Sequence, residues 1–420
     1  MNKYRVIAAA FLIYIVFAIL LNSVGTVILQ VIGNYGVSKS GASILEAFKD
    51  MPIAVVSFLV ASFLPRIGYK NAMLGALALV FGACVAMPLA PSFLTTKLLF
   101  LCTGVGFALV KVSVYSTVGL IARDGREHAS LLNMLEGFFM VGVLSAYFVF
   151  GAFIDSSDPR SLGWLKVYWV LAGLCATAFV LLLSTPFSEG AAALPSGRSR
   201  LGDFTAMLAL VARPLVAVFI MSAFLYVLVE QSIGTWLPTF NNEILKLPTA
   251  MSVEVTSVFA ASLALGRIAA GFIMRRLSWY PVLCACVLGM AATVLVALPM
   301  TRQIVADPHI TWATAPLATF AFPLIGLFMA PIYPGINSVM LSSLPPSQHS
   351  SMTGLLVIFS ALGGSTGSFI TGYVFGHADG QSAFYLTLVP ITLLLLTIMF
   401  FRRQVEGIAP DRPVFHGAAH

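Results

Sequence analysis

Ionisable side chains within long apolar runs are the residues of this sequence best placed to do chemistry. Lys111 lies deep in the apolar run 94–121, about ten residues and therefore roughly 15 Å from the C-terminal end of that run. An ammonium group at this depth could bind an anionic substrate or release a proton. The alternative is a structural lysine neutralised by a carboxylate of a neighbouring segment.

Glu230 is the carboxylate most suited to proton uptake and release. It lies beside Gln231 in run 211–239, ahead of Gly234 and Pro238. A Gly and a Pro so close together weaken helical hydrogen bonding, which is typical of helices that move during transport. The alternative is a structural hydrogen bond from Glu230 to a neighbouring helix.

Other carboxylates lie nearer the ends of their runs. Glu136 either faces a substrate or reaches the surface as a helix-end carboxylate, and the sequence leaves open whether it pairs with Lys111. Glu46, Lys49 and Asp50 are spaced three and four residues apart, which places them on one helix face. They form either an outer gate or proton entry site, or an internally neutralised, solvated face, which we favour.

The remaining polar candidates serve packing or binding. Arg267 lies too deep for its guanidinium to reach the surface easily, so we expect it to pair between helices. Amides could hydrogen-bond a hydroxylated substrate and aromatic rings could stack on a sugar, but both types also serve as packing contacts and interfacial anchors. These candidates are Asn22, Gln30, Asn337, Tyr226, Trp236 and Tyr333.

Composition indicates that these residues belong to a membrane protein. Apolar residues make up 59% of the chain and charged residues 9%, whereas a soluble domain carries about 25% charged residues. Lipid cannot satisfy backbone polar groups, so each apolar run must be a helix. We predict an all-α membrane protein with twelve transmembrane helices in two six-helix halves, at about 6–31, 41–64, 71–90, 94–121, 130–153, 163–185, 211–239, 252–274, 280–300, 313–343, 353–377 and 382–401.

A hydrophilic break separates the two groups of six. The stretch from Pro186 to Phe204 is rich in Ser, Gly and Pro, a composition typical of a mobile linker. Arg66 and Arg276 close the second and eighth runs at corresponding places, and parallel repeats of this kind place a substrate site between the halves. We predict an N-terminal half at 1–185, a cytoplasmic linker at 186–206, a C-terminal half at 207–403 and a cytoplasmic tail at 404–420.

Charge fixes the expected orientation and excludes other classes. Lys and Arg concentrate in every second connection, which predicts both termini in the cytoplasm and a place in the cell inner membrane. The first run is too long for a cleaved signal peptide. The net charge of +7 reflects cytoplasmic loops, so we expect no nucleic-acid partner. We expect a monomer in the lipid bilayer.

Enzyme chemistry finds no support in the residue pattern. The five cysteines all lie in apolar runs and show neither metal spacing nor a disulfide framework. No nucleotide-binding loop, zinc motif or spacing of a nucleophile with its base occurs. We therefore expect no cofactor, no metal and no catalytic activity. Transport must then be driven by a gradient.

The two-half layout and a short cationic turn resemble the major facilitator superfamily. The turn "ASFLPRIGYK" is similar to that superfamily's loop motif, with Arg66, Gly68 and Lys70 matching and Ala61 and Pro65 in place of its Gly and Asp. The resemblance implies the major facilitator fold. The missing acid puts in doubt the ion pair that the motif normally makes.

A narrower resemblance is to the fucose:proton symporter branch. The segment Phe224–Phe240, with "GRIAAGF" and "APIYPGINSVML", is similar to the seventh, eighth and tenth helices of that branch. The resemblance implies proton-coupled sugar uptake. The branch's coupling carboxylates in helices one and four are absent, because Gly25 and Leu109 occupy those positions. Its coupling chemistry is therefore not carried over to this chain.

These observations predict a secondary active transporter that works by alternating access. The expected substrate is a small hydrophilic solute, sugar-like or carboxylated, with a proton as coupling ion. Lys111 tilts the expectation toward an anionic group. Two alternatives stay open: an efflux antiporter for amphipathic compounds, and a membrane receptor on a transporter scaffold that moves nothing.

Overall fold

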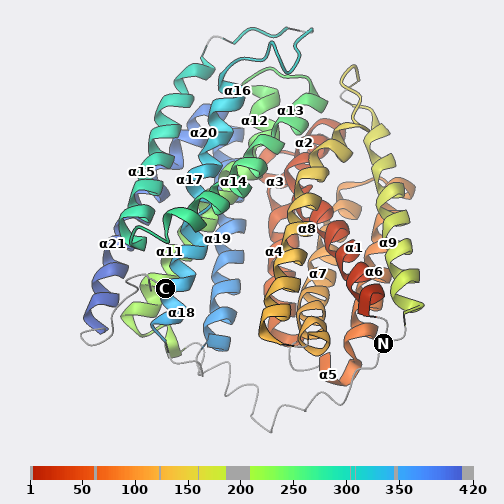
Figure 1. The fold of residues 1–420 in the computed structure, drawn as a ribbon. Coiled ribbons are helices and arrows are strands. Elements are labelled where there is room, and N and C mark those ends of the chain that lie inside the picture. Colours follow the sequence, from red (N-terminus) through yellow and green to blue (C-terminus); the bar gives the residue numbers. More distant parts are fainter. Residues whose placement is uncertain are drawn as a thin grey trace. The chain divides into compact units, whose positions relative to one another are not determined.

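The protein is helical throughout the part of the chain that its computed structural model describes. The described residues are 3–60, 64–122, 124–158, 160–185, 209–302, 304–307, 309–344 and 349–408. Every regular element within these ranges is an α- or 3₁₀-helix (Figure 1), which confirms the predicted fold class. The predicted linker at 186–206 lies outside the described residues, and so does the tail beyond residue 408.

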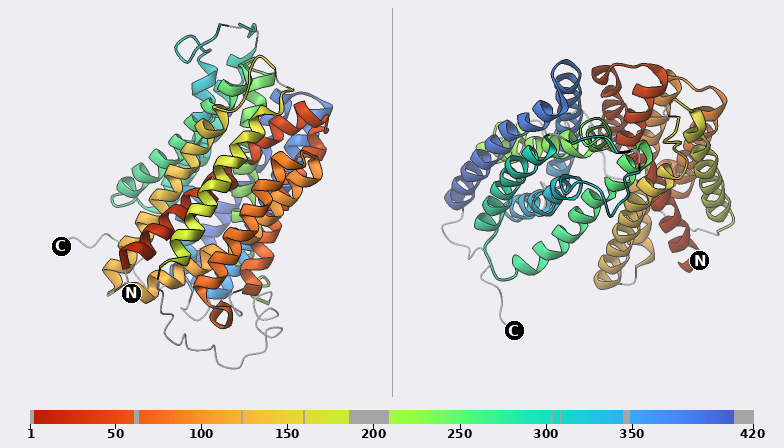
Figure 2. Two further views of the ribbon diagram at one scale, coloured as in Figure 1. Left: turned by 90° about the vertical axis from the view of Figure 1, so that its right-hand side faces the viewer. Right: turned by 90° about the horizontal axis from the view of Figure 1, so that it is seen from above.

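The chain forms two compact units. One comprises Met1–Gly197 together with Thr249–Glu254, and the other comprises Arg198–Pro248 together with Val255–His420. In each unit the long helices run side by side as a bundle (Figure 2).

The helices of the first unit follow the first six predicted runs. They are α1 (Lys3–Asn22), α2 (Val24–Tyr35), α3 (Lys39–Ala42), α4 (Ile44–Val60), α5 (Leu64–Ile67), α6 (Tyr69–Leu89), α7 (Phe93–Ile121), α8 (Gly125–Gly151), η1 (Leu162–Lys166) and α9 (Val167–Leu183). The helix pairs α1–α8, α4–α7, α6–α7 and α6–α9 pack most extensively.

The second unit repeats this plan with more interruptions. Its helices are α11 (Pro214–Gly234), α12 (Leu237–Glu243), α14 (Ser257–Ile273), α15 (Trp279–Ala297), η2 (Pro299–Thr301), α16 (Ala318–Ala321), η3 (Phe322–Leu324), α17 (Ile325–Met329), α18 (Ile332–Ser342), α19 (His349–His377), α20 (Gly380–Leu386) and α21 (Leu388–Ile408). Helix α13 (Thr249–Val255) contains the segment grouped with the first unit.

Eleven helical stretches among the described residues are long and apolar enough to cross a membrane. The remaining predicted span corresponds to α4, which has 17 residues and carries Glu46, Lys49 and Asp50. Helix α4 is absent from the eleven because it is short and carries three charged residues. The chain is therefore a multi-pass membrane protein.

Interruptions of the long helices follow from backbone chemistry. One break lies at Pro331, because α17 ends at Met329 and α18 begins at Ile332. A break between α1 and α2, at Ser23, was not expected from the sequence. Proline lacks an amide hydrogen and clashes with the preceding turn, which explains the first interruption. We have no physical account of the second.

The cationic turn after α5 joins α6 to the C-terminal end of α9. Gly68 has φ of 87°, a left-handed conformation that side chains disfavour. Directly after it, Nζ of Lys70 donates to the carbonyl oxygens of Leu183 (3.0 Å) and Thr185 (2.8 Å). A cation is favourable at the negative end of a helix dipole. Lys70 thus caps the C-terminus of α9.

Close packing of α11 against α19 depends on glycine. A Cβ on Gly363 or Gly367 would overlap the carbonyl oxygens of Phe224 and Leu228, respectively. The small residues of α19 therefore allow close helix approach. In the first unit, Gly104 of α7 is pressed in the same way against the carbonyl oxygen of Lys49 in α4.

Candidate functional site

Lys111 projects from the middle of α7 as an exposed side chain. Its Nζ lies 5.8 Å from the centre of the Phe107 ring, one turn earlier, in cation–π geometry. Lys111 forms no ion pair within the described residues. The structure therefore offers no carboxylate partner for Lys111 within the described residues.

The side chain of Lys111 and the lipid-facing side chains of α7 lie on different sides of the helix. The exposed apolar residues of this helix are Leu94, Leu98 and Leu120, at 62%, 46% and 47% exposure. At 3.6 residues per turn, Lys111 points about 100–180° away from each of them. An ammonium group on that side avoids the lipid, where a charge is costly.

Glu136 of α8 lies on the corresponding side of its own helix. The exposed apolar residues Met134, Val141 and Phe148 mark the lipid side of α8. Glu136 is also exposed, and helical geometry places it about 120–160° away from them. It accepts a hydrogen bond from the hydroxyl of Tyr115 in α7 at 2.5 Å. The pairing with Lys111 that the sequence left open is not made in the described structure.

Tyr14 of α1 completes this polar group. Tyr14 is 1% exposed, and its hydroxyl lies beside that of Tyr115 without a hydrogen bond of full geometry within the described residues. The hydroxyl lies within electrostatic range of Tyr115 and Glu136. Three helices, α1, α7 and α8, thus bring two phenols and a carboxylate together.

Aromatic rings cover one side of this group. The ring of Phe139, one turn from Glu136 on α8, lies 6.0 Å from Tyr14 and 5.8 Å from Phe107 between ring centres. Phe107 in turn lies 6.0 Å from Phe17. These rings form an apolar wall beside the cation of Lys111. We call Tyr14, Lys111, Tyr115 and Glu136 the N-half polar cluster.

The second unit carries a related arrangement. Tyr226 of α11 donates to Oε1 of Glu230 at 3.2 Å and packs on Tyr333 of α18, with ring centres 5.5 Å apart. The hydroxyl of Tyr333 lies 3.1 Å from that of Ser360 in α19. Arg267 of α14 acts electrostatically on Tyr226. Ser360 in α19 and Glu136 in α8 lie at the same distance from the first residue of their helices. The two groups that a tyrosine contacts therefore occupy equivalent positions in the two halves.

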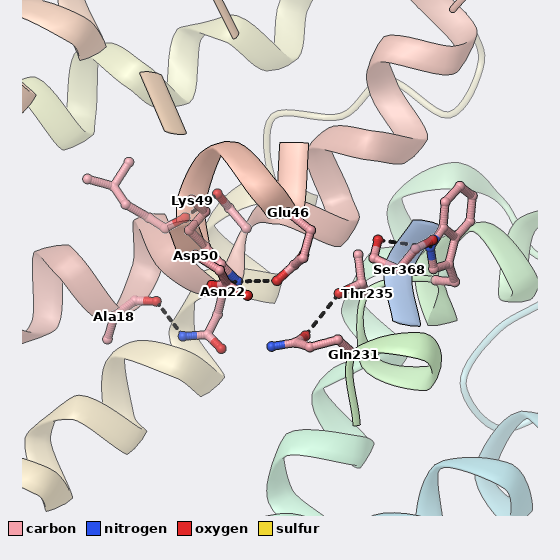
Figure 3. A network of polar contacts seen from close by, with 11 residues as sticks. Ala18, Asn22, Glu46, Lys49, Asp50, Gln231, Thr235 and Ser368 are labelled. Carbon is pink, nitrogen blue, oxygen red and sulfur yellow. Dashed lines mark hydrogen bonds and ion pairs between the residues drawn. The ribbon is translucent and has the colours of Figure 1, made fainter. Parts of the chain in front are cut away.

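Two of the three charged residues of α4 are buried, contrary to the solvated face we favoured. Glu46 is 0% and Lys49 6% exposed. Nζ of Lys49 contacts Oε1 of Glu46 and lies 3.4 Å from Oδ1 of Asp50 (Figure 3). Internal neutralisation is confirmed. The burial arises because Gly104 of α7 allows the backbone of α4 to approach closely.

Most of the other sequence-predicted residues bond to neighbouring groups of the protein. Asn22 donates to the carbonyl oxygen of Ala18 in its own helix at 2.8 Å. Gln231 accepts from Thr235 at 3.0 Å (Figure 3). Trp236 is fully buried, and its Nε1 donates to the carbonyl oxygen of Ser368 at 3.0 Å. Asn337 lies partly buried, with no partner for Oδ1 within the described residues.

Comparison with known families decides what kind of molecule carries these groups. The sequence profile described as Major Facilitator Superfamily matches residues 7–323. The chain belongs to the Major Facilitator Superfamily. Members of this superfamily are transporters and not enzymes. No curated protein matches the chain in sequence.

Solved structures of the superfamily share the fold. A bacterial homologue of the human lysosomal transporter Spinster, inward-facing and occupied, has a TM-score of 0.77 at 14% identity, over 98% of this chain and 100% of that one. A D-xylose–proton symporter has 0.72 at 14%, over 95% and 98%. The transporter FucP, in its outward conformation, has 0.60 at 15%, over 94% and 98%. Identities this low establish the fold alone.

Sequence reasoning missed Tyr14, Tyr115 and Ser360. Tyrosine and serine are ordinary residues of transmembrane helices, so their type carries little information. One signal was present for Tyr115, because it follows Lys111 by four residues and therefore shares its helix face. Nothing in the sequence marks Tyr14 or Ser360, whose neighbours come from other helices of this superfamily member.

Proposed function

We propose that this protein is a secondary active transporter that moves a small hydrophilic solute with an anionic group across the cell inner membrane by alternating access. The observation that carries the proposal is Lys111, an exposed cation in the middle of a membrane helix, directed away from lipid. A charge at that depth is costly unless water, a partner or a ligand compensates it. Both termini lie in the cytoplasm, and the protein acts as a monomer.

A proton is the proposed coupling ion, with Glu230 as the group that carries it. Glu230 is partly buried and accepts a hydrogen bond from Tyr226. A carboxylate in an apolar setting favours its neutral form, and a phenol donor favours its anion. Opposed influences of this kind suit a group that takes up and releases a proton during a transport cycle.

The anion site is tested by removing the charge of Lys111 and measuring ligand-induced stabilisation of the purified protein. Carboxylated solutes, including sugar acids, are titrated against wild type and Lys111→Met. A charge-assisted contact contributes about 1.5–3 kcal/mol, so binding weakens about 10- to 100-fold in the variant. Because a ligand that binds only the folded state raises the unfolding temperature, the shift seen in wild type disappears.

Lys97→Met is the matched control. Lys97 lies on the same helix and also faces aromatic rings, with Nζ 5.0 Å from the Phe93 ring centre, but it sits near the start of α7. The control keeps the stabilisation seen in wild type. Equal stabilisation of Lys111→Met and wild type by every carboxylated solute contradicts the proposal.

The second candidate function is an efflux antiporter for amphipathic compounds. The aromatic wall beside Lys111 supports it, because aromatic rings can bind the apolar part of such a compound. The ring of Phe107 lies 6.0 Å from that of Phe17 and 5.8 Å from that of Phe139 between ring centres. Transport assays in vesicles of both orientations separate the two functions. Solute accumulation in right-side-out vesicles supports uptake, whereas accumulation in inverted vesicles supports efflux. No movement in either orientation supports a receptor.

A further inference from the structure

Two opposite charges of the N-half polar cluster remain unpaired with each other. Lys111 and Glu136 lie on neighbouring helices of one compact unit, each on the side away from lipid. Within the described residues neither forms an ion pair. By contrast, Lys49 in the same unit contacts both of its carboxylates directly. The unit therefore neutralises one set of charges internally and leaves the other set available.

The carboxylate of Glu136 retains binding capacity. A carboxylate has about four acceptor sites, and Tyr115 uses one of them at Oε1. Tyr115 also fixes the position of the carboxylate. Glu136 can therefore accept further hydrogen bonds from a solute that carries an ammonium group.

The hydroxyl of Tyr14 is the second and independent observation that points to a ligand. It is buried to 99%, lies beside Tyr115 and Glu136, and makes no hydrogen bond of full geometry within the described residues. A buried hydroxyl without a hydrogen bond is unfavourable by about 1–3 kcal/mol. A solute donor bound at Glu136 would relieve this cost, because a phenol oxygen accepts as well as donates.

The two charges are connected through Tyr115, which lies on the same face of α7 as Lys111 and donates to Glu136. Lys111 precedes Tyr115 by four residues, which corresponds to about 6 Å along α7. Each charge-assisted hydrogen bond spans about 2.8 Å. The ring of Phe107 lies beside Lys111, and the ring of Phe139, one turn from Glu136, lies 5.8 Å from that of Phe107 between ring centres. Both offer apolar faces to a short carbon skeleton.

We infer that the solute is amphoteric: a small amino-acid-like molecule whose carboxylate binds Lys111 and whose ammonium group binds Glu136 beside Tyr14. This inference rests on the proposed function and names its substrate class. It requires both charges on the same solute, because Lys111 alone recognises any carboxylate. Glu136 supplies the selectivity for the amino group.

The test compares molecules that share a skeleton and differ only in charge. The probes are phenylalanine, 3-phenylpropanoate and phenethylamine, with alanine, propanoate and ethylamine as a second set. Dissociation constants are obtained by titrating thermal stabilisation of the full-length purified protein. We expect one amino acid to bind wild type at least about tenfold tighter than its own carboxylate or amine.

Variants assign each charge to its residue. Lys111→Met loses binding of the amino acid, and Glu136→Gln reduces the amino acid to the affinity of its deaminated form. Glu127→Gln, the same change at the start of the same helix, leaves the preference unchanged. Tyr14→Phe keeps or raises the unfolding temperature of the free protein, because its hydroxyl makes no hydrogen bond of full geometry there, yet weakens amino-acid binding several-fold.

The outcomes distinguish this inference from the proposed function. If the carboxylates bind as tightly as the amino acids and Glu136→Gln changes neither, the amphoteric solute is overturned while the anion site at Lys111 stands. If no probe or sugar acid depends on Lys111, both are overturned. If Tyr14→Phe lowers the unfolding temperature without any effect on binding, Tyr14 is structural and the ammonium subsite is overturned.

Discussion

At the scale of single residues, burial separates side chains that hold the protein together from those available to a ligand. Trp236 was a candidate for stacking on a solute, yet it is fully buried. Its Nε1 donates to both the carbonyl oxygen (3.0 Å) and the hydroxyl (3.2 Å) of Ser368. Lys111 and Glu136, by contrast, remain exposed. Trp236 is therefore a stabilising residue in this structure.

We predict that Trp236→Phe destabilises the protein more than Ser368→Ala. The first change removes the indole donor, so a fully buried side chain loses its hydrogen bonds to Ser368 and part of its packed volume, which costs about 1–3 kcal/mol. The second change leaves the bond to the carbonyl in place and costs less than about 1 kcal/mol. Unfolding temperatures in detergent measure both. Equal losses for the two variants would show that volume, and not the hydrogen bond, is what Trp236 contributes.

At the scale of helices, glycine sets how closely two helices approach. Gly363 and Gly367 of α19 lie against the backbone of α11, the helix that carries Tyr226 and Glu230. Lipid gives little hydrophobic drive for helix association, so close van der Waals packing is what holds such a pair. The position of Glu230 therefore depends on the glycines of a helix that it does not belong to.

We predict opposite effects of the same substitution at two glycines of the second unit. In Gly367→Ala the new Cβ meets the carbonyl oxygen of Leu228 and lies 2.9 Å from the hydroxyl of Ser232, so overpacking costs about 1–3 kcal/mol. In Gly271→Ala nothing lies within 4 Å, and the higher helix propensity of alanine makes the change neutral or favourable. Unfolding temperatures check the pair. A neutral Gly367→Ala would contradict the close contact.

At the scale of the whole molecule, the two units repeat a motif but differ in its charge. Tyr115 contacts a carboxylate at Glu136, whereas its counterpart Tyr333 contacts the hydroxyl of Ser360. The carboxylate of the second unit is Glu230, which lies on the same helix as Tyr226. This asymmetry supports a division of labour, with solute charge recognised in the first unit and the coupling proton carried in the second.

We predict that Glu230→Gln uncouples transport without abolishing it. A glutamine cannot take up a proton, so a proton gradient no longer drives accumulation. Exchange of labelled for unlabelled solute across the membrane needs no net proton movement and continues. Proteoliposomes with and without an imposed gradient measure both activities. Gradient-driven accumulation by Glu230→Gln equal to that of wild type would exclude Glu230 as the coupling group.

The sequence by itself determined the number, order and approximate bounds of the membrane helices. Lipid satisfies no backbone polar group, so runs of apolar residues are forced into helices whatever their neighbours are. The depth of Lys111 and the break at Pro331 follow from the same local rules. Helix α4 shows the limit of those rules. The sequence suggested a solvated face there, but Glu46 of that face is buried.

Only the tertiary structure decided which side chains meet. The rotation of each helix about its axis is set by packing against residues far away in sequence, such as Gly104 beneath the backbone of α4. That rotation brings Tyr14, Tyr115 and Glu136 together from three helices and buries the rings of Trp236 and Tyr226. Helix periodicity gives the relative direction of residues within one helix, but it cannot give the direction of one helix with respect to another.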